Sequence, residues 1–147
     1  DAAKAHEIIM NGSIAYSLMN YYQTDKSNLH PYTVKRIEAG IPVSASDYVS
    51  AIEQAKKMKQ ILKQFFKKYD AIITPAAPGQ APRDLMNTGN AIFNGYWTMM
   101  GVPAISLPFL KGRDNLPIGI QFIANWSEDL KLLEICKEVL KKEKLAD

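Results

Sequence analysis

The chain has 147 residues, 47% of them apolar, and a formal net charge of +3. This length and apolar content suit one domain, or a piece of a larger one, with a real hydrophobic core, and the mild charge does not indicate a nucleic-acid partner. A single cysteine excludes an intrachain disulfide and favours a reducing, cytoplasmic setting, and no apolar run reaches the roughly 18 to 20 residues that a membrane span needs.

The first 43 residues predict two helices. Residues 1 to about 22 carry apolar side chains at three- and four-residue steps, the period of one helix face. Pro31 can begin a short helix, because the first turn leaves its N–H groups unbonded in any case. Gly40 marks the predicted end of that helix.

The strongest helix signal follows this segment. Ser44 and Asp47 have the spacing of a capping box, in which a hydroxyl and a carboxylate satisfy the free N–H groups of the first turn. The apolar stripe that begins after them predicts a helix ending near Asp70.

Three short apolar runs come next, and each has the length of a buried strand bounded by Pro, Gly or Asn. They are Ala71–Thr74, Ala104–Phe109 and Ile118–Ala124. The third run is mostly apolar on both faces of a period-two pattern, which is typical of a strand covered on both sides. Helices followed by strands indicate an α/β fold.

A last helix follows Ser127, with acidic residues in its first turn. Its predicted buried face consists of Leu130, Leu133, Cys136 and Leu140. Because a reactive thiol needs a partner base and some exposure, Cys136 is interpreted as a packing residue.

The residues do not by themselves assemble a catalytic or metal-binding apparatus. His6 and His30 lie in different elements with no ligand at metal-binding spacing, so we expect no metal. No serine lies in G-x-S-x-G, and Ser106 is interpreted as a small strand residue within an apolar run. No phosphate-binding glycine motif is present, so no cofactor is expected. Six lysines between Lys56 and Lys68 are interpreted as the solvated face of a helix.

Several ordered segments nevertheless form a specific pattern: YDAIITPAAPGQAP, GVPAISLPF and LPIGIQFIANWSEDLKLLEICKEVL. In order and spacing they resemble the C-terminal part of the amidase signature family of hydrolases, from about Tyr32 to Leu140. The resemblance implies an α/β fold with helices packed on a mixed β-sheet. Residues 1–147 would form the C-terminal part of one amidase signature domain. In it, residues 1–43 would be a helical segment with loops, and residues 44–147 the long helix, the strands and the last helix.

The resemblance also implies hydrolysis of a carboxylic amide, and often of esters, through a serine acyl-enzyme. Family members use a serine nucleophile with a second serine and a lysine as proton relay, and all three lie in the family's N-terminal half. No glycine- and serine-rich stretch of that kind occurs here. We therefore expect a chain that opens on Asp1 to be processed or truncated, to hold no catalytic residue and to be inactive alone. Its expected partners are a small-molecule amide and the remaining N-terminal part of the enzyme; a homo-oligomer stays open, and no nucleic acid or membrane is expected.

Two places can be carried over from the family as substrate-binding residues. Arg36, in RIEAG, stands where members that act on glutamine have an arginine that binds the substrate carboxylate, a task for which the guanidinium fork is suited. The second place is the aromatic segment before GVP, where the pocket would be shaped by Asn90, Phe93, Asn94 and Trp97.

The sequence departs from the glutamine-using subunits in that segment. No acid stands on or next to Ala91, where those subunits bind the substrate's amino group, and Thr98 replaces an asparagine common in the family. A general amidase is therefore the first hypothesis. The glutamine-hydrolysing A subunit of a tRNA-dependent amidotransferase is the second. A non-catalytic binding or interaction domain that reuses the fold is the third, because fold alone does not fix function.

Overall fold

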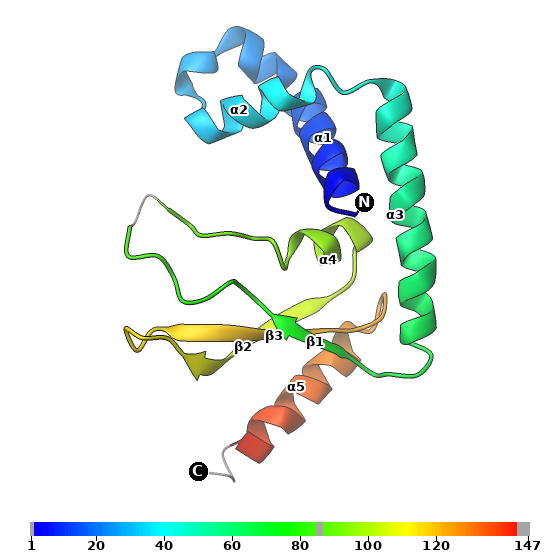
Figure 1. Cartoon of the computed structure of the whole chain (residues 1–147), viewed down its shortest axis with the longest axis vertical. Helices are drawn as coiled ribbons and strands as arrows, with labels where there is room; N and C mark the ends of the chain where they lie inside the picture. The colour runs from blue at the N-terminus through cyan, green and yellow to red at the C-terminus, as the bar shows by residue number, and fades with distance from the viewer. Residues whose placement is uncertain (1, 85–86, 144–147) are drawn as a thin grey trace. The chain divides into compact units, whose positions relative to one another are not determined.

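The computed structural model describes residues 2–84 and 87–143, whose helices and strands Figure 1 labels. The chain divides into two compact units, Asp1–Lys59 and Gln60–Asp147. In chain order the elements are α1 (Ala2–Thr24), a 3-10 turn (Lys26–Asn28), α2 (Pro31–Gly40), α3 (Ala45–Phe65), β1 (Ile72–Pro75), α4 (Gly95–Met100), β2 (Ala104–Lys111), β3 (Pro117–Ile123) and α5 (Asp129–Glu143). All the predicted helices and strands are present, and α4 is an addition. Within the described ranges, no helix is long and apolar enough to cross a membrane.

In the first unit, α1 and α2 pack tightly against one another at Gly40. A Cβ atom on Gly40 would lie 2.0 Å from the carbonyl oxygen of Asn11 and 2.6 Å from the Cβ of Ala15. Real packing does not allow such distances, so glycine is required here. Ile37, one turn earlier on α2, is completely buried at 0% exposure.

The predicted starts of α2 and α3 are confirmed. Pro31 occupies the first turn of α2, and the N–H of Tyr32 donates to Nδ1 of His30 at 3.2 Å. At the start of α3, the N–H of Asp47 donates to Oγ of Ser44 at 3.1 Å. Side chains therefore satisfy N–H groups that the first helical turns leave free.

The boundary between the two units lies inside α3. The predicted division of one domain into residues 1–43 and residues 44–147 stays a prediction. Tyr48, on the first turn of α3, lies in the first unit, and its hydroxyl lies 3.0 Å from Oγ of Ser13 on α1.

The end of α3 comes earlier than predicted. The helix ends at Phe65 and not near Asp70. Beyond it, the N–H groups of Lys68 and Tyr69 both donate to the carbonyl oxygen of Phe65, at 2.9 and 3.0 Å. This closes a turn that redirects the chain into β1.

The second unit is built on a three-stranded sheet in the order β1-β3-β2, and both pairings are antiparallel. Phe122, on the central strand β3, pairs with Ile73 on β1 and with Ile105 on β2. Gln121, Phe122 and Ile123 are all buried, with at most 3% exposure. The prediction that this strand is covered on both faces is therefore confirmed.

The predicted fold class, α/β with helices packed on a β-sheet, is also confirmed. The predicted mixture of strand directions is not seen among the three strands that the described residues form, because each neighbouring pair is antiparallel.

Helix α5 packs on one face of this sheet and forms the main core. The buried members of the core are Leu107, Phe122, Ala124, Leu132 and Cys136. The predicted buried face of the helix is wrong in part, because Leu130 and Leu133 are 77% and 55% exposed. Cys136 is buried and Leu140 packs against the core, as predicted, and Leu132 is buried in place of Leu130 and Leu133, with Ile135 and Val139 packed beside it. The leucine-rich sequence supports either stripe at helical spacing, and contact with the sheet selects one.

Replacing Gly40 by alanine is expected to lower the free energy of unfolding by about 1–3 kcal/mol, because the added methyl group overpacks the contact between α1 and α2. Urea unfolding followed by circular dichroism measures the change. The matched control is Gly79→Ala, since nothing lies within 4 Å of a Cβ at Gly79; it should change the stability by no more than about 0.5 kcal/mol. Equal stabilities for the two variants would contradict the described packing.

Candidate functional site

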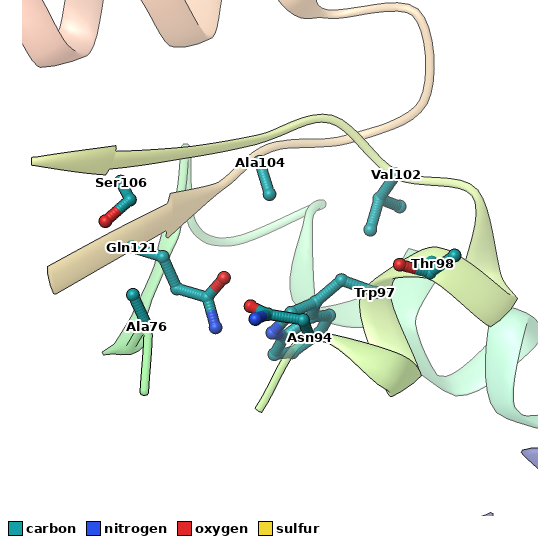
Figure 2. A pocket seen from close by; sticks show the side chains of 8 residues that line it. All are labelled: Ala76, Asn94, Trp97, Thr98, Val102, Ala104, Ser106 and Gln121. Atoms are coloured by element: carbon teal, nitrogen blue, oxygen red, sulfur yellow. The ribbon is translucent and has the colours of Figure 1, made fainter. Parts of the chain in front are cut away.

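A pocket of about 330 Å³ opens on the face of the sheet opposite α5 (Figure 2). Strands β2 and β3, the segment after β1, and α4 with its flanking residues all contribute to it. Its lining consists of Ala76, Asn94, Trp97, Thr98, Val102, Ala104, Ser106 and Gln121. Ala104 and Ser106 alternate along β2 with residues that face α5. One face of the strand therefore contributes to the core, and the other face lines the pocket.

Gln121 holds the pocket together. It lies on β3 opposite Ser106 and is 3% exposed. Its Nε2 donates to the carbonyl oxygen of Pro75 at 2.9 Å and to that of Phe93 at 3.0 Å. One side chain therefore connects the central strand, the end of β1 and the entry to α4.

A second contact fixes the other end of α4. The indole N–H of Trp126 donates to the carbonyl oxygen of Met100 at 2.8 Å. Gly101 then ends the helix with φ 67, the left-handed conformation that glycine adopts without strain, and its N–H returns to the carbonyl oxygen of Trp97 at 2.9 Å. With both ends held, α4 presents Asn94 and Trp97 to the pocket on a short, constrained element.

A second cavity, of about 590 Å³, adjoins the pocket and shares Ala76, Asn94 and Ser106 with it. We call it the loop cavity, because the chain segments 76–82 and 88–91 supply most of its wall. The pocket and the loop cavity are therefore neighbours with part of their lining in common.

The loop wall is tied to the turn between β2 and β3. Asp114, on that turn, pairs with the guanidinium of Arg83 and accepts a hydrogen bond from Nε2 of Gln80. The N–H of Asp114 donates in return to Oε1 of Gln80 at 3.1 Å. The hydrogen bonds from Arg83 and Gln80 lower the pKa of the Asp114 carboxyl below its ordinary value.

Neither cavity is lined by a charged side chain. Among the residues described for the two linings, none is Asp, Glu, Lys, Arg or His. Within the described ranges, no group of three or more His, Cys, Asp or Glu could hold a metal ion. Cys136 lies on α5 in the core, where burial raises the pKa of its thiol, so it remains protonated as a packing residue. The site is therefore one for hydrogen bonding and apolar contact.

Four predicted site residues belong to this unit. Asn94 lines both cavities, Trp97 lines the pocket and Asn90 lines the loop cavity. Oδ1 of Asn90 accepts a hydrogen bond from the N–H of Ile92 at 3.0 Å. Phe93 takes part through its backbone carbonyl, which binds Gln121, and not through a ring among the lining residues. Whether these residues contact a substrate stays a prediction.

Arg36 belongs to the first unit, on α2. Its Nε and Nη2 both donate to the hydroxyl of Tyr32, at 3.0 and 2.8 Å. Its Nη1 donates to Oδ1 of the buried Asn11 at 3.0 Å. The Nε–Nη2 edge, one of the edges by which a guanidinium binds a carboxylate in bidentate fashion, is therefore engaged within the chain.

The sequence reasoning missed Gln121 and the lining role of Ser106. Ser106 is a strand residue as predicted, but its side chain points into the pocket (Figure 2). A signal was present, because the small Ala104 and Ser106 occupy one face of an otherwise bulky strand. A glutamine inside an apolar strand is a second signal, since a buried amide requires hydrogen-bond partners.

Comparison with known proteins identifies the fold. The chain superposes on a crystal structure of an amidase with a TM-score of 0.79 and 20% sequence identity, over 91% of this chain and 33% of that one. It superposes on 6-aminohexanoate cyclic dimer hydrolase with a TM-score of 0.68 and 18% identity, over 90% of this chain and 33% of the hydrolase. At these identities the likeness establishes the fold alone.

The sequence identifies the family. The profile described as Amidase matches residues 2–133, so the chain belongs to the amidase signature family, and the predicted resemblance is confirmed. It is 34% identical over 125 residues, or 78% of this chain, to the A subunit of glutamyl-tRNA(Gln) amidotransferase from Aliarcobacter butzleri. It is 29% identical over 101 residues, or 60% of this chain, to the putative amidase AmiC of Mycobacterium leprae. The chain spans only 28% and 22% of the lengths of these two relatives.

Replacing Gln121 by leucine is expected to reduce the free energy of unfolding by about 2–4 kcal/mol, because two backbone carbonyls lose their donor inside the protein. Chemical denaturation followed by circular dichroism measures the loss. Gln64→Leu is the matched control, since Gln64 is exposed on α3; it should alter the stability by at most about 0.5 kcal/mol. A Gln121→Leu protein as stable as the control would mean that this side chain does not hold the site together.

The ion pair at Asp114 is expected to depend on pH. The pKa of this carboxyl is lowered in the folded chain, so the contribution of the ion pair is complete above the unfolded-state pKa of about 4. That contribution is lost as the pH falls through the lower folded-state pKa. The side-chain amide signals of Gln80 in ¹H–¹⁵N spectra should report this transition below pH about 4, and Asp114→Asn should abolish it. A transition at or above the ordinary aspartate value would contradict the described pairing.

Proposed function

We propose that this chain forms one wall of the substrate pocket of an enzyme that hydrolyses small neutral carboxylic amides, and related esters. The proposal rests on the pocket beside α4, whose described lining has no charged side chain. The family match over residues 2–133 supplies the class of reaction. A charged substrate would leave its charge without a partner among the lining side chains, and such an uncompensated charge costs binding free energy.

In the proposed reaction, a serine hydroxyl adds to the amide carbonyl carbon, the C–N bond breaks and the amine leaves with a proton. Water then hydrolyses the acyl-enzyme ester. Ser106 is unsuited to act as this nucleophile, because no side chain described in the lining of either cavity is a base that could accept its proton. We assign the nucleophilic serine, its partner serine and the lysine to a part of the enzyme outside this chain. That part is the chain's proposed protein partner, and the setting is proposed to be cytoplasmic; a homo-oligomer stays open.

Hydrolysis of glutamine is the second candidate. It is favoured by the 34% identity to the A subunit of a glutamyl-tRNA(Gln) amidotransferase. Glutamine carries a carboxylate and an ammonium group, and the structure supplies no acid to the described linings. The hydrogen bonds of Arg36 to Tyr32 are a further argument against this candidate, since they occupy the Nε–Nη2 edge of the guanidinium. The neutral amide is therefore the first proposal.

The test begins with a fluorophosphonate probe, which labels activated serines. The isolated chain should not be labelled. The complete enzyme, expressed from the encoding reading frame including what lies upstream of Asp1, should be labelled on a serine outside residues 1–147. It should also release ammonia from benzamide with a kcat/KM at least about tenfold above that for glutamine, since a missing charge partner is worth that much discrimination.

The outcomes separate the candidates. A preference for glutamine would replace the first candidate by the second. Labelling of a serine within this chain would overturn the assignment of the nucleophile. An enzyme that neither reacts with the probe nor releases ammonia from any amide would favour a binding domain without catalysis.

A further inference from the structure

The orientation of the Gln121 amide is determined by its partners. Both partners, Pro75 and Phe93, offer carbonyl oxygens, which only accept hydrogen bonds, so the NH₂ group must face them. Each of its two hydrogens is then used once. The other half of the amide, Oε1, is consequently an acceptor whose direction cannot be reversed without losing both bonds.

This oxygen opens on the pocket without a donor. In the described part of the chain, Oε1 of Gln121 accepts no hydrogen bond, although the residue itself is only 3% exposed. No fully buried side-chain nitrogen or oxygen in the described residues lacks a partner, so Oε1 must be reachable from the cavity. Figure 2 shows the amide of Gln121 directed into the pocket toward Asn94. An acceptor held in this way is available to an N–H or O–H donor from water or from a ligand.

The surroundings define the kind of donor. A cationic ammonium group would need a carboxylate, and none is present in the described lining. The indole of Trp97 and the apolar Val102 and Ala104 offer contact to a flat, apolar group. The volume of about 330 Å³ lies at the lower end of ligand pockets and has room for a small ring.

We propose that the pocket binds the N–H of a neutral primary carboxamide carried on a small planar apolar group, with the N–H donating to Oε1 of Gln121. The inference rests on the proposed function in one respect, because it assumes that the bound amide is the substrate. The side chain of Gln121 then has two roles. Its NH₂ group binds the carbonyl oxygens of Pro75 and Phe93, and its oxygen accepts the N–H of the ligand.

The experiment titrates the ¹⁵N-labelled chain with benzamide and with N,N-dimethylbenzamide. The two compounds share the ring and the carbonyl, but the second has no N–H donor. Benzamide should shift the side-chain signals of Gln121, Asn94 and Trp97 in a saturable manner, and the dimethyl compound should bind at least about tenfold more weakly. Benzoate, whose carboxylate would face the oxygen of Gln121, should bind weakest of the three.

A variant locates the binding without disturbing Gln121. Ala104→Met places an apolar side chain in the pocket and should abolish the benzamide shifts. Ala39→Met, at an exposed position of α2, is the matched control and should leave them unchanged. Equal affinities for benzamide and its dimethyl derivative, or shifts that survive Ala104→Met, would overturn the inference, as would the absence of saturable binding.

These readouts report binding and not turnover. Selective benzamide binding by the chain, when the complete enzyme hydrolyses no amide, would sustain the inference and refute the proposed function. Amide hydrolysis without the N–H selectivity would do the reverse.

Discussion

The second unit depends on one buried side chain, the amide of Gln121. A three-stranded sheet leaves the segments beyond its strand ends free to take many paths. By donating to the carbonyls of Pro75 and Phe93, Gln121 ties two such segments to the central strand. A buried amide is stable only when its donors are satisfied, so the polar group and the two backbone segments stabilise one another. The pocket is the space that these constraints leave between the sheet and α4.

The sheet divides its two faces between stability and recognition. The face toward α5 carries bulky apolar side chains from alternating positions of β2 and β3, packed on Leu132 and Cys136. The opposite face carries Ala104, Ser106 and Gln121, and Gly119 lies beside them without a side chain. A Cβ on Gly119 would lie 2.2 Å from Oγ of Ser106 and 3.0 Å from the Cβ of Ala76. Small residues on this face therefore keep the pocket open, while large ones on the other face supply the core.

The chemical character of the site follows from the lining that these elements provide. Hydroxyl, amide and indole groups surround a space with no charged group in the described linings, which suits orientation of a neutral ligand and not proton transfer. This agrees with the proposal that the nucleophile and its proton relay lie outside this chain. Asp114 and Arg83 form an ion pair that lies outside the linings of both cavities. This ion pair connects the loop wall to the turn between β2 and β3.

The sequence by itself determined the local structure and the family. Pro31, Gly40 and the pair Ser44 and Asp47 predicted helix ends that the structure contains, because capping is decided by residues a few positions apart. The three apolar runs predicted the strands for the same reason. Only the tertiary structure decided which stripe of α5 is buried, that Gln121 reaches two distant carbonyls, and that Ser106 lines a pocket. Each of these features depends on contacts between residues far apart in the chain. A local sequence pattern can show that a helix or strand has an apolar face, but it does not show which other element packs against that face.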